Sequence, residues 1–119
     1  MDPNATETEF KDAVIDLAHS FGWKVVHFRP AQTKHGWRTP VQGDGKGWPD
    51  LILVHRSGWL ILAELKDRRG VLSKEQAEWR DTLTEVTEHL LMTRVKYFIW
   101  RPKDWSEIVR ILSFGAAHA

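Results

Sequence analysis

Cysteine is absent from all 119 positions of the sequence. This absence excludes a disulfide-linked scaffold and a zinc site with thiolate ligands, and it is typical of a reducing compartment. Long hydrophobic runs are also missing, because no apolar stretch approaches the ~18 residues of a membrane-spanning helix. The first ten residues are acidic and polar, unlike a signal peptide. We therefore expect a cytoplasmic protein with no membrane association.

An excess of charge of one sign is missing too, since 17 basic residues face 16 acidic ones. The charges are nevertheless unevenly distributed. Residues 1–22 carry five acidic side chains against one lysine, and residues 23–48 carry five basic side chains against one aspartate. A basic segment interrupted by Trp37 and Trp48 suits a polyanion such as nucleic acid, although ordinary surface charge produces the same pattern.

The length and the 42% hydrophobic content are sufficient for one domain with a core. We expect a single domain over residues 1–119, with its core at about 6–112 and a frayed tail at 113–119. Hydrophobic periodicity predicts an α/β fold with a mixed β-sheet flanked by helices, in the order α-β-β-β-α-β-α. The expected elements are a helix ending before Gly22, strands at 23–28, 50–54 and 59–66, a helix from Ser73, a strand at 95–100 and a helix at 104–112.

The strands at 50–54 and 59–66 are separated by a short turn and should form a hairpin. Both strands are apolar on both faces, so helices should cover the sheet on both sides. The helix from Ser73 should turn four residues inward: Ala77, Trp79, Leu83 and Val86. The segment 30–47, rich in proline and glycine, is too long for an ordinary connection and is expected to be a functional or mobile loop.

Charged residues within the apolar hairpin are the sharpest functional signal. Asp50 begins one strand, and Glu64 and Lys66 end the next. Glu64 and Lys66 share a face because side chains alternate along a strand, and the hairpin places Asp50 beside Glu64. Charges at such positions are costly unless they are paired or bound to a metal ion. A structural ion pair between the lysine and the carboxylates is the alternative explanation.

Two neighbouring carboxylates repel each other unless a cation compensates them. Ligands that are all oxygen favour Mg²⁺ or Mn²⁺, which activate water and stabilise charge on a phosphate. Lys66 is placed to position the attacking water or to neutralise the developing charge.

Pro49-Asp50 followed by Glu64-Leu65-Lys66 resembles the PD-(D/E)xK nuclease signature. The G-x-P-D form of residues 47–50 and the position of Gln76, ten residues after Lys66, resemble the VRR-NUC family in particular. The resemblance covers about residues 6–112. It implies a restriction-endonuclease-like core, divalent-metal phosphodiesterase activity on duplex or branched DNA, and a stand-alone homodimer working in replication, repair or recombination in a bacterial or phage-infected cell.

The resemblance also implies individual roles. Asp50, Glu64 and the carbonyl of Leu65 would bind metal, Lys66 would be the catalytic lysine, and Gln76 would support the site. Gln76 equally fits a capping box that begins at Ser73.

The family's helical glutamate has two candidates in this sequence. Glu7 continues the apolar stripe of Phe10 and Val14, whereas Glu9 completes a capping box with Thr6. We favour Glu7 as the metal ligand.

Six basic residues are expected to contact DNA: Lys34, Arg38, Lys46, Arg68, Arg69 and Lys74. Trp37 and Trp48 would either stack on unpaired bases or pack on the domain surface. No nucleotide cofactor is expected, because residues 43–47 lack the spacing of a phosphate-binding loop. Two alternatives remain: a junction-binding module without catalysis, and a restriction or transposon-end nuclease of the same fold.

Overall fold

The computed structural model describes residues 1–28, 31–33, 36–38, 43–89 and 94–117, with only the backbone described for 31–33 and 36–38. Its main sheet has the strand order β1-β4-β5-β6, formed by Lys24–His27, Leu51–Val54, Leu60–Leu65 and Val95–Trp100. β1 and β5 pair antiparallel with β4, and β6 pairs parallel with β5. The sheet is therefore mixed, as expected.

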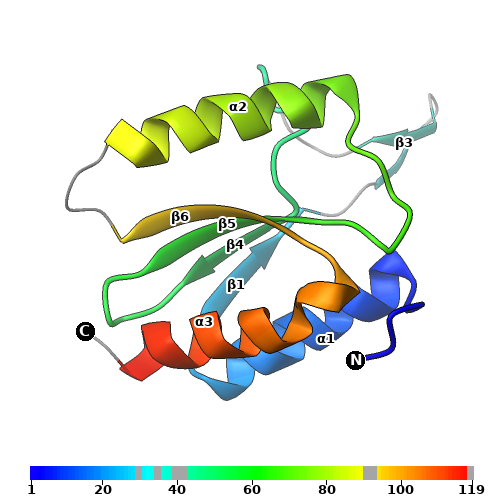
Figure 1. Ribbon diagram of the computed structural model, residues 1–119. Coiled ribbons are helices and arrows are strands. Elements are labelled where there is room, and N and C mark those ends of the chain that lie inside the picture. Colours follow the sequence, from blue (N-terminus) through cyan, green and yellow to red (C-terminus); the bar gives the residue numbers. More distant parts are fainter. Residues whose placement is uncertain (29–30, 34–35, 39–42, 90–93, 118–119) are drawn as a thin grey trace.

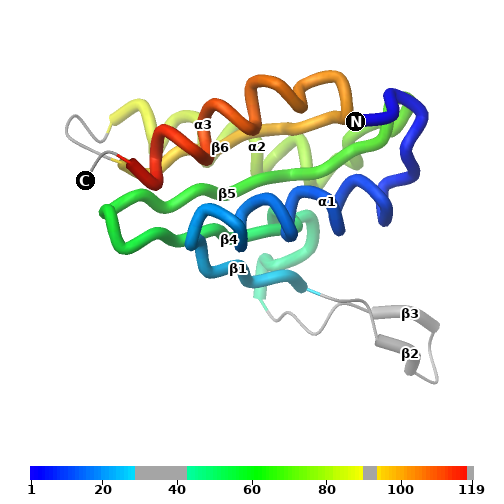
Figure 2. The backbone as a smooth tube through the Cα atoms, turned by 90° about the horizontal axis from the view of Figure 1, so that it is seen from below, coloured from blue at the N-terminus to red at the C-terminus, as the bar shows by residue number. Residues whose placement is uncertain are grey.

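Helices cover both faces of this sheet (Figure 1). Helix α2 (Lys74–His89) lies on one face, and helices α1 (Glu7–Ser20) and α3 (Trp105–Ala117) lie on the other. Figure 2, which views the molecule from below, shows α1 in front of β4 and β5, with α3 nearer to β6. The apolar character of β5 follows from this arrangement, because Ile61–Leu65 are all buried between the two layers. The predicted α/β class with flanking helices is confirmed.

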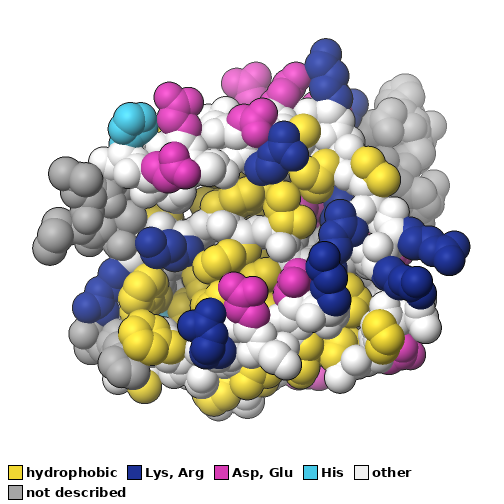
Figure 3. All heavy atoms as spheres, in the orientation of Figure 1, with side chains coloured by type: hydrophobic (Ala, Val, Ile, Leu, Met, Phe, Trp, Pro, Cys, Tyr) yellow, Lys and Arg dark blue, Asp and Glu magenta, His cyan; other side chains and the backbone are white. Residues whose placement is uncertain are grey.

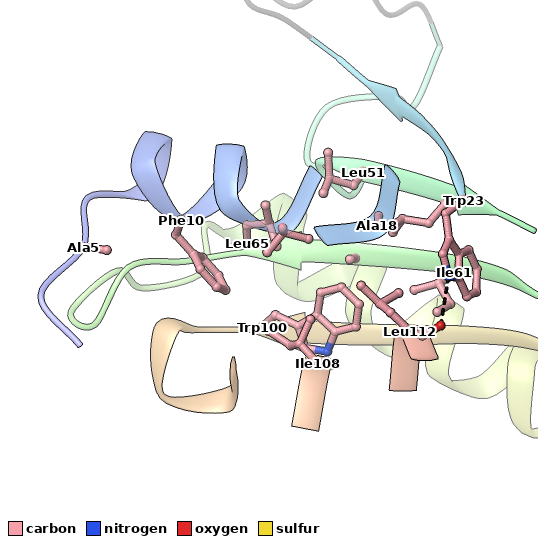
Figure 4. Packing of buried hydrophobic residues seen from close by; sticks show 13 residues of the cluster. Ala5, Phe10, Ala18, Trp23, Leu51, Ile61, Leu65, Trp100, Ile108 and Leu112 are labelled. Carbon is pink, nitrogen blue, oxygen red and sulfur yellow. Dashed lines mark hydrogen bonds between the residues drawn. The ribbon is translucent and has the colours of Figure 1, made fainter. Parts of the chain in front are cut away.

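The core lies between the sheet and the pair α1 and α3 (Figure 4). The helical stripe of α1 buries Phe10, Val14 and Ala18 completely. Trp23 enters the core from the start of β1, and its indole Nε1 donates a 3.1 Å hydrogen bond to the carbonyl of Leu112. This bond ties the first strand to the last helix across 89 residues of sequence.

The final helix is longer than the expected range of 104–112. A 3₁₀ turn, η1 (Pro102–Asp104), precedes α3, and α3 continues to Ala117. Asp104 accepts a hydrogen bond from the backbone N–H of Arg101, so it closes the 3₁₀ turn. Gly115 is buried against Trp23, where an added Cβ would lie 2.7 Å from the ring. Residues 113–117 are therefore part of α3, unlike the frayed tail expected at 113–119, and residues 118 and 119 lie outside the described residues.

Two further elements lie in the segment expected to be a loop. β2 (Ala31–Thr33) and β3 (Gly36–Arg38) pair antiparallel as a separate sheet, with Gln32 opposite Trp37. The element order therefore contains one more pair of strands than predicted. Each of these strands is only three residues long, which is too short to give a clear alternating pattern in the sequence. The high proline and glycine content of 30–47 also made the segment resemble a loop.

Helix α2 differs from the expectation at one inward position. Leu83 is buried, but Val86 is 48% exposed. Val86 therefore lies on the solvent-facing side of α2, and the prediction that it turns inward is wrong. Among the helices of the described residues, none has the length and apolar character required to cross a membrane.

Candidate active site

The β4–β5 hairpin brings the two candidate carboxylates together. Asp50 directly precedes β4, and Glu64 is the penultimate residue of β5. The antiparallel register pairs Leu51 with Ala63, so one further step sets Asp50 opposite Glu64. Oδ2 of Asp50 accepts a 2.8 Å hydrogen bond from the backbone N–H of Leu65. The end of β5 therefore orients the Asp50 carboxylate as well as carrying Glu64.

Glu64 is the one buried residue with an ionisable side chain among the described residues, at 1% exposure. Its Oε1 accepts a 3.0 Å hydrogen bond from the side-chain amide of Gln76. The ammonium Nζ of Lys66 lies 4.0 Å from the same oxygen. A carboxyl group in an apolar sheet requires such partners, because unpaired burial of a polar group is costly.

Burial and neighbouring charge shift the ionisation of this cluster. Burial raises the pKa of Glu64 to about 9, with further contributions from the charge of Asp50 and from a hydrogen bond with it. Burial, followed by the charge of Asp50, also raises the pKa of Glu7. Burial and then the charge of Glu64 raise the pKa of Tyr97 to about 12. In the absence of a cation, Glu64 therefore holds its proton at neutral pH.

Leu65 contributes to two parts of the molecule. Its side chain is 1% exposed and packs in the core toward α1 (Figure 4). Its backbone lies between Glu64 and Lys66 and, through the bond to Asp50, is part of the site. Core packing thus fixes the backbone on which the charged residues are arranged.

Glu7 and Glu9 occupy different environments at the start of α1. Glu7 lines a pocket of about 300 Å³ together with Lys11, His27 and Asp50. Glu9 completes a capping box: its N–H donates to the Thr6 hydroxyl, and its carboxylate accepts from the N–H of Thr6. The geometry therefore places Glu7 in one pocket with Asp50 and gives Glu9 a structural task at the helix start.

Gln76 performs both of the tasks considered for it. Its Oε1 accepts a hydrogen bond from the N–H of Ser73, and its own N–H donates to the Ser73 hydroxyl. These bonds cap the start of α2. The amide nitrogen of the same side chain is the donor to Glu64. The helix start is therefore connected directly to the buried carboxyl group.

The basic residues expected to bind DNA differ in their exposure and in their contacts. Arg68 and Arg69 are exposed next to the site, and Arg68 donates a 3.0 Å hydrogen bond to Asn4. Lys74 is exposed at the first position of α2. Lys46 instead forms an ion pair, with its Nζ 3.4 Å from Oε1 of Glu75. Two expected residues have no described side chain: Lys34 lies outside the described residues, and Arg38 is described only as backbone in β3. Figure 3 shows Lys and Arg side chains gathered near the end of the molecule where β5 leads into α2.

Trp48 is partly buried and packs against Trp79 of α2, as in the second of the two alternatives considered for it, packing on the domain surface. Its ring meets that of Trp79 edge-on, with centroids 4.8 Å apart. The Trp79 indole donates to the carbonyls of Asp44 and Lys46, so α2 holds residues 44–48 in place. Trp37 lies among the residues without a described side chain.

In the described part of the chain, no three His, Cys, Asp or Glu side chains are already arranged to hold a metal ion. The chemistry of the available donors suits a hard divalent cation, since they are the carboxylates of Glu7, Asp50 and Glu64 and a backbone carbonyl. The charge of Asp50 contributes to the raised pKa of Glu64, and a bound cation would offset that contribution.

Sequence reasoning missed Arg101, which contacts the turn that follows Lys66. No local sequence pattern identifies this contact, because it follows from the parallel register of β5 and β6, which pairs Leu65 with Trp100 and so places the two following residues side by side. A comparison with protein-family models and a search of curated proteins each find no match for this chain.

Proposed function

We propose that this chain is a divalent-metal-dependent DNA endonuclease of the PD-(D/E)xK type, with a restriction-endonuclease-like core and the features of the VRR-NUC family. One observation carries the proposal: Asp50 and the buried Glu64 meet at the end of the β4–β5 hairpin, with Lys66 within 4.0 Å of Glu64. A structural ion pair alone does not account for two adjacent carboxyl groups, one of which is fully buried.

Glu7, Asp50, Glu64 and the carbonyl of Leu65 would hold Mg²⁺ or Mn²⁺. Such an ion, when bound, lowers the pKa of water and neutralises charge on a phosphate. Lys66 places its ammonium beside Glu64, where it would stabilise negative charge that develops on the phosphate. Gln76 keeps the Glu64 carboxyl in its orientation through the 3.0 Å hydrogen bond. Asp50 is oriented by the N–H of Leu65.

DNA as the substrate is supported by the position of the basic side chains. Arg68 and Arg69 follow Lys66 in the chain and are exposed, and Lys74 begins the helix that carries Gln76. Each of these cations would contact a phosphate near the carboxylates. A single domain has a small footprint, so we propose a homodimer that acts on duplex or branched DNA.

The test is a cleavage assay on supercoiled, single-stranded, flap and four-way DNA, with Mg²⁺, Mn²⁺ or EDTA. We expect cutting with either metal and none in EDTA, and no cutting by Asp50→Asn. Arg110→Gln is a suitable control variant, because that exposed arginine lies on α3 near Glu107, outside the residues expected to bind metal or DNA. Undiminished cutting in EDTA would refute the metal-dependent mechanism. Binding of branched DNA without any cutting would support the junction-binding alternative.

A further inference from the structure

The chain makes a tight turn at residues 67–70, directly after Lys66. Oδ1 of Asp67 accepts hydrogen bonds from the backbone N–H groups of Arg69, at 3.0 Å, and Gly70, at 2.6 Å. An aspartate that bonds to backbone N–H groups two and three residues ahead stabilises a turn locally. The direction in which the chain leaves the site therefore depends on this turn.

Arg101 holds the turn from the end of β6. Its Nη1 donates to the carbonyl of Asp67, at 2.8 Å, and to that of Gly70, at 2.7 Å. Its own backbone is fixed, because its N–H donates to Asp104 at the 3₁₀ turn. The N–H of Lys66 donates to the carbonyl of Trp100, the residue before Arg101. One guanidinium thus binds the first and the last residue of the turn and attaches the turn to the end of β6.

The 67–70 turn touches the side chain of Lys66. A Cβ atom placed on Gly70 would lie 3.1 Å from Cδ of Lys66 and 3.5 Å from its Cβ. The backbone at Gly70 is therefore packed against the stem of the lysine. The ammonium at the end of that stem is 4.0 Å from Oε1 of Glu64, and the side chain is only 12% exposed. A long flexible side chain in such a position loses much rotamer freedom, so it needs a rigid neighbour.

We propose that Arg101 is a positioning residue for Lys66. It acts through the 67–70 turn, whose closure directs the lysine stem toward Glu64. The proposal rests on the proposed nuclease function for its catalytic consequence, but the closure of the turn and the placement of Lys66 can be measured without any nuclease activity.

The experiment compares the full-length protein with Arg101→Gln, Arg101→Lys and the control Arg110→Gln, whose exposed arginine lies on α3 near Glu107. Tryptic cleavage after the exposed Arg68 and Arg69, located by mass spectrometry, reports the opening of the turn. Acetylation of the Lys66 amine, also followed by mass spectrometry, reports its release from Glu64. Values of kcat and KM for DNA cleavage report the consequence, and the melting midpoint reports global folding.

Arg101→Gln should raise both the tryptic and the acetylation rate by about tenfold, the scale expected for losing hydrogen bonds from a charged donor. Its kcat should fall by a similar factor, with KM little changed. Arg101→Lys should restore part of each effect, because one ammonium can donate to two carbonyls. Gly70→Ala should lower kcat while Arg101 is intact, since the added methyl group would lie 3.1 Å from both Cδ of Lys66 and Oδ1 of Asp67 and would disturb the contact between the turn and the lysine stem.

Wild-type reactivity of Lys66 in Arg101→Gln would overturn the proposal, as would an open turn with an unchanged kcat. If Arg101→Gln does not fold, the same comparison is made with Arg101→Lys and Gly70→Ala. A wild-type protein that cuts no DNA would remove the nuclease proposal, whereas the tryptic and acetylation rates would still decide whether Arg101 positions Lys66.

Discussion

The side-chain amide of Gln76 donates a 3.0 Å hydrogen bond to Oε1 of Glu64, which joins the first turn of α2 to the end of β5. The same Gln76 side chain accepts a hydrogen bond from the N–H of Ser73. One residue therefore couples the start of a helix to a buried carboxyl group. The two tasks can be separated by substitution, because they use different atoms of the amide.

Gln76→Glu keeps an acceptor for the N–H of Ser73 but removes the donor to Glu64. We expect DNA cleavage to fall about tenfold, on the scale of losing one hydrogen bond to a buried carboxyl group. Ser73→Ala is the matched variant: it should lower the free energy of unfolding by about 1 kcal/mol and leave cleavage nearly unchanged. Equal losses of cleavage in the two variants would show that Gln76 acts only as a cap.

Lys66→Ala should reduce DNA cleavage by ~10²-fold or more, the scale of losing an electrostatic stabiliser in the transition state. Affinity for DNA should change little, because many basic groups hold the phosphates. Cleavage kinetics and fluorescence anisotropy with labelled DNA measure the two quantities. A collapse of affinity with normal turnover of the bound DNA would identify Lys66 as a DNA anchor.

The two glutamates of the first turn of α1 should respond differently to the same substitution. Glu7→Gln is expected to remove most of the activity, because this residue lies in the pocket with Asp50. Glu9→Gln should be mild, since glutamine also completes the capping box with Thr6. Cleavage rates and melting midpoints of both variants provide the check. The reverse result would mean that Glu9 belongs to the metal site.

The raised pKa of Glu64 determines how the metal-free protein responds to pH. Its folded-state pKa of about 9 lies above the ordinary value of 4.5, so the folded state retains a proton that the unfolded chain releases. This contribution to stability is complete below about pH 4.5 and is lost as the pH rises through about 9. In EDTA, the melting midpoint of the wild-type protein should fall across that interval.

Glu64→Gln replaces the titrating group by a neutral one and should flatten this dependence. Mg²⁺ or Mn²⁺ should raise the wild-type midpoint by mass action but have little effect on Glu64→Gln. Glu9→Gln serves as the control, because its carboxyl group is exposed at the helix start. Parallel pH profiles for the wild type and Glu64→Gln would contradict the assignment of the pH dependence to Glu64.

A homodimer is the expected assembly. One cluster per chain cuts one strand at a time, so symmetric cutting of a four-way junction needs two sites related by a two-fold axis. Sedimentation at micromolar concentration tests this directly, and affinity for DNA should fall steeply between low and physiological salt. A strict monomer that cuts both strands of a junction in concert would refute the arrangement.

Local patterns in the sequence were sufficient for most of the secondary structure and for the arrangement of the carboxylates. The 3.6-residue periodicity of Phe10 and Val14 placed α1, and two apolar runs joined by a short turn placed β4 and β5. Since antiparallel pairing by a short turn leaves little freedom of register, the closeness of Asp50 and Glu64 followed from the sequence. The capping boxes at Thr6 and Ser73 followed as well, because they involve residues only three positions apart.

Only the tertiary structure decided the features that depend on contacts between distant segments. Gly115 continues α3 because it packs on Trp23, and Trp79 holds the loop before Asp50. Arg101 reaches the turn after Lys66 because β6 lies parallel to β5, a register set by a crossover through the whole of α2. Local periodicity reports which face of an element is apolar, but it carries no information on which distant residue that face will meet.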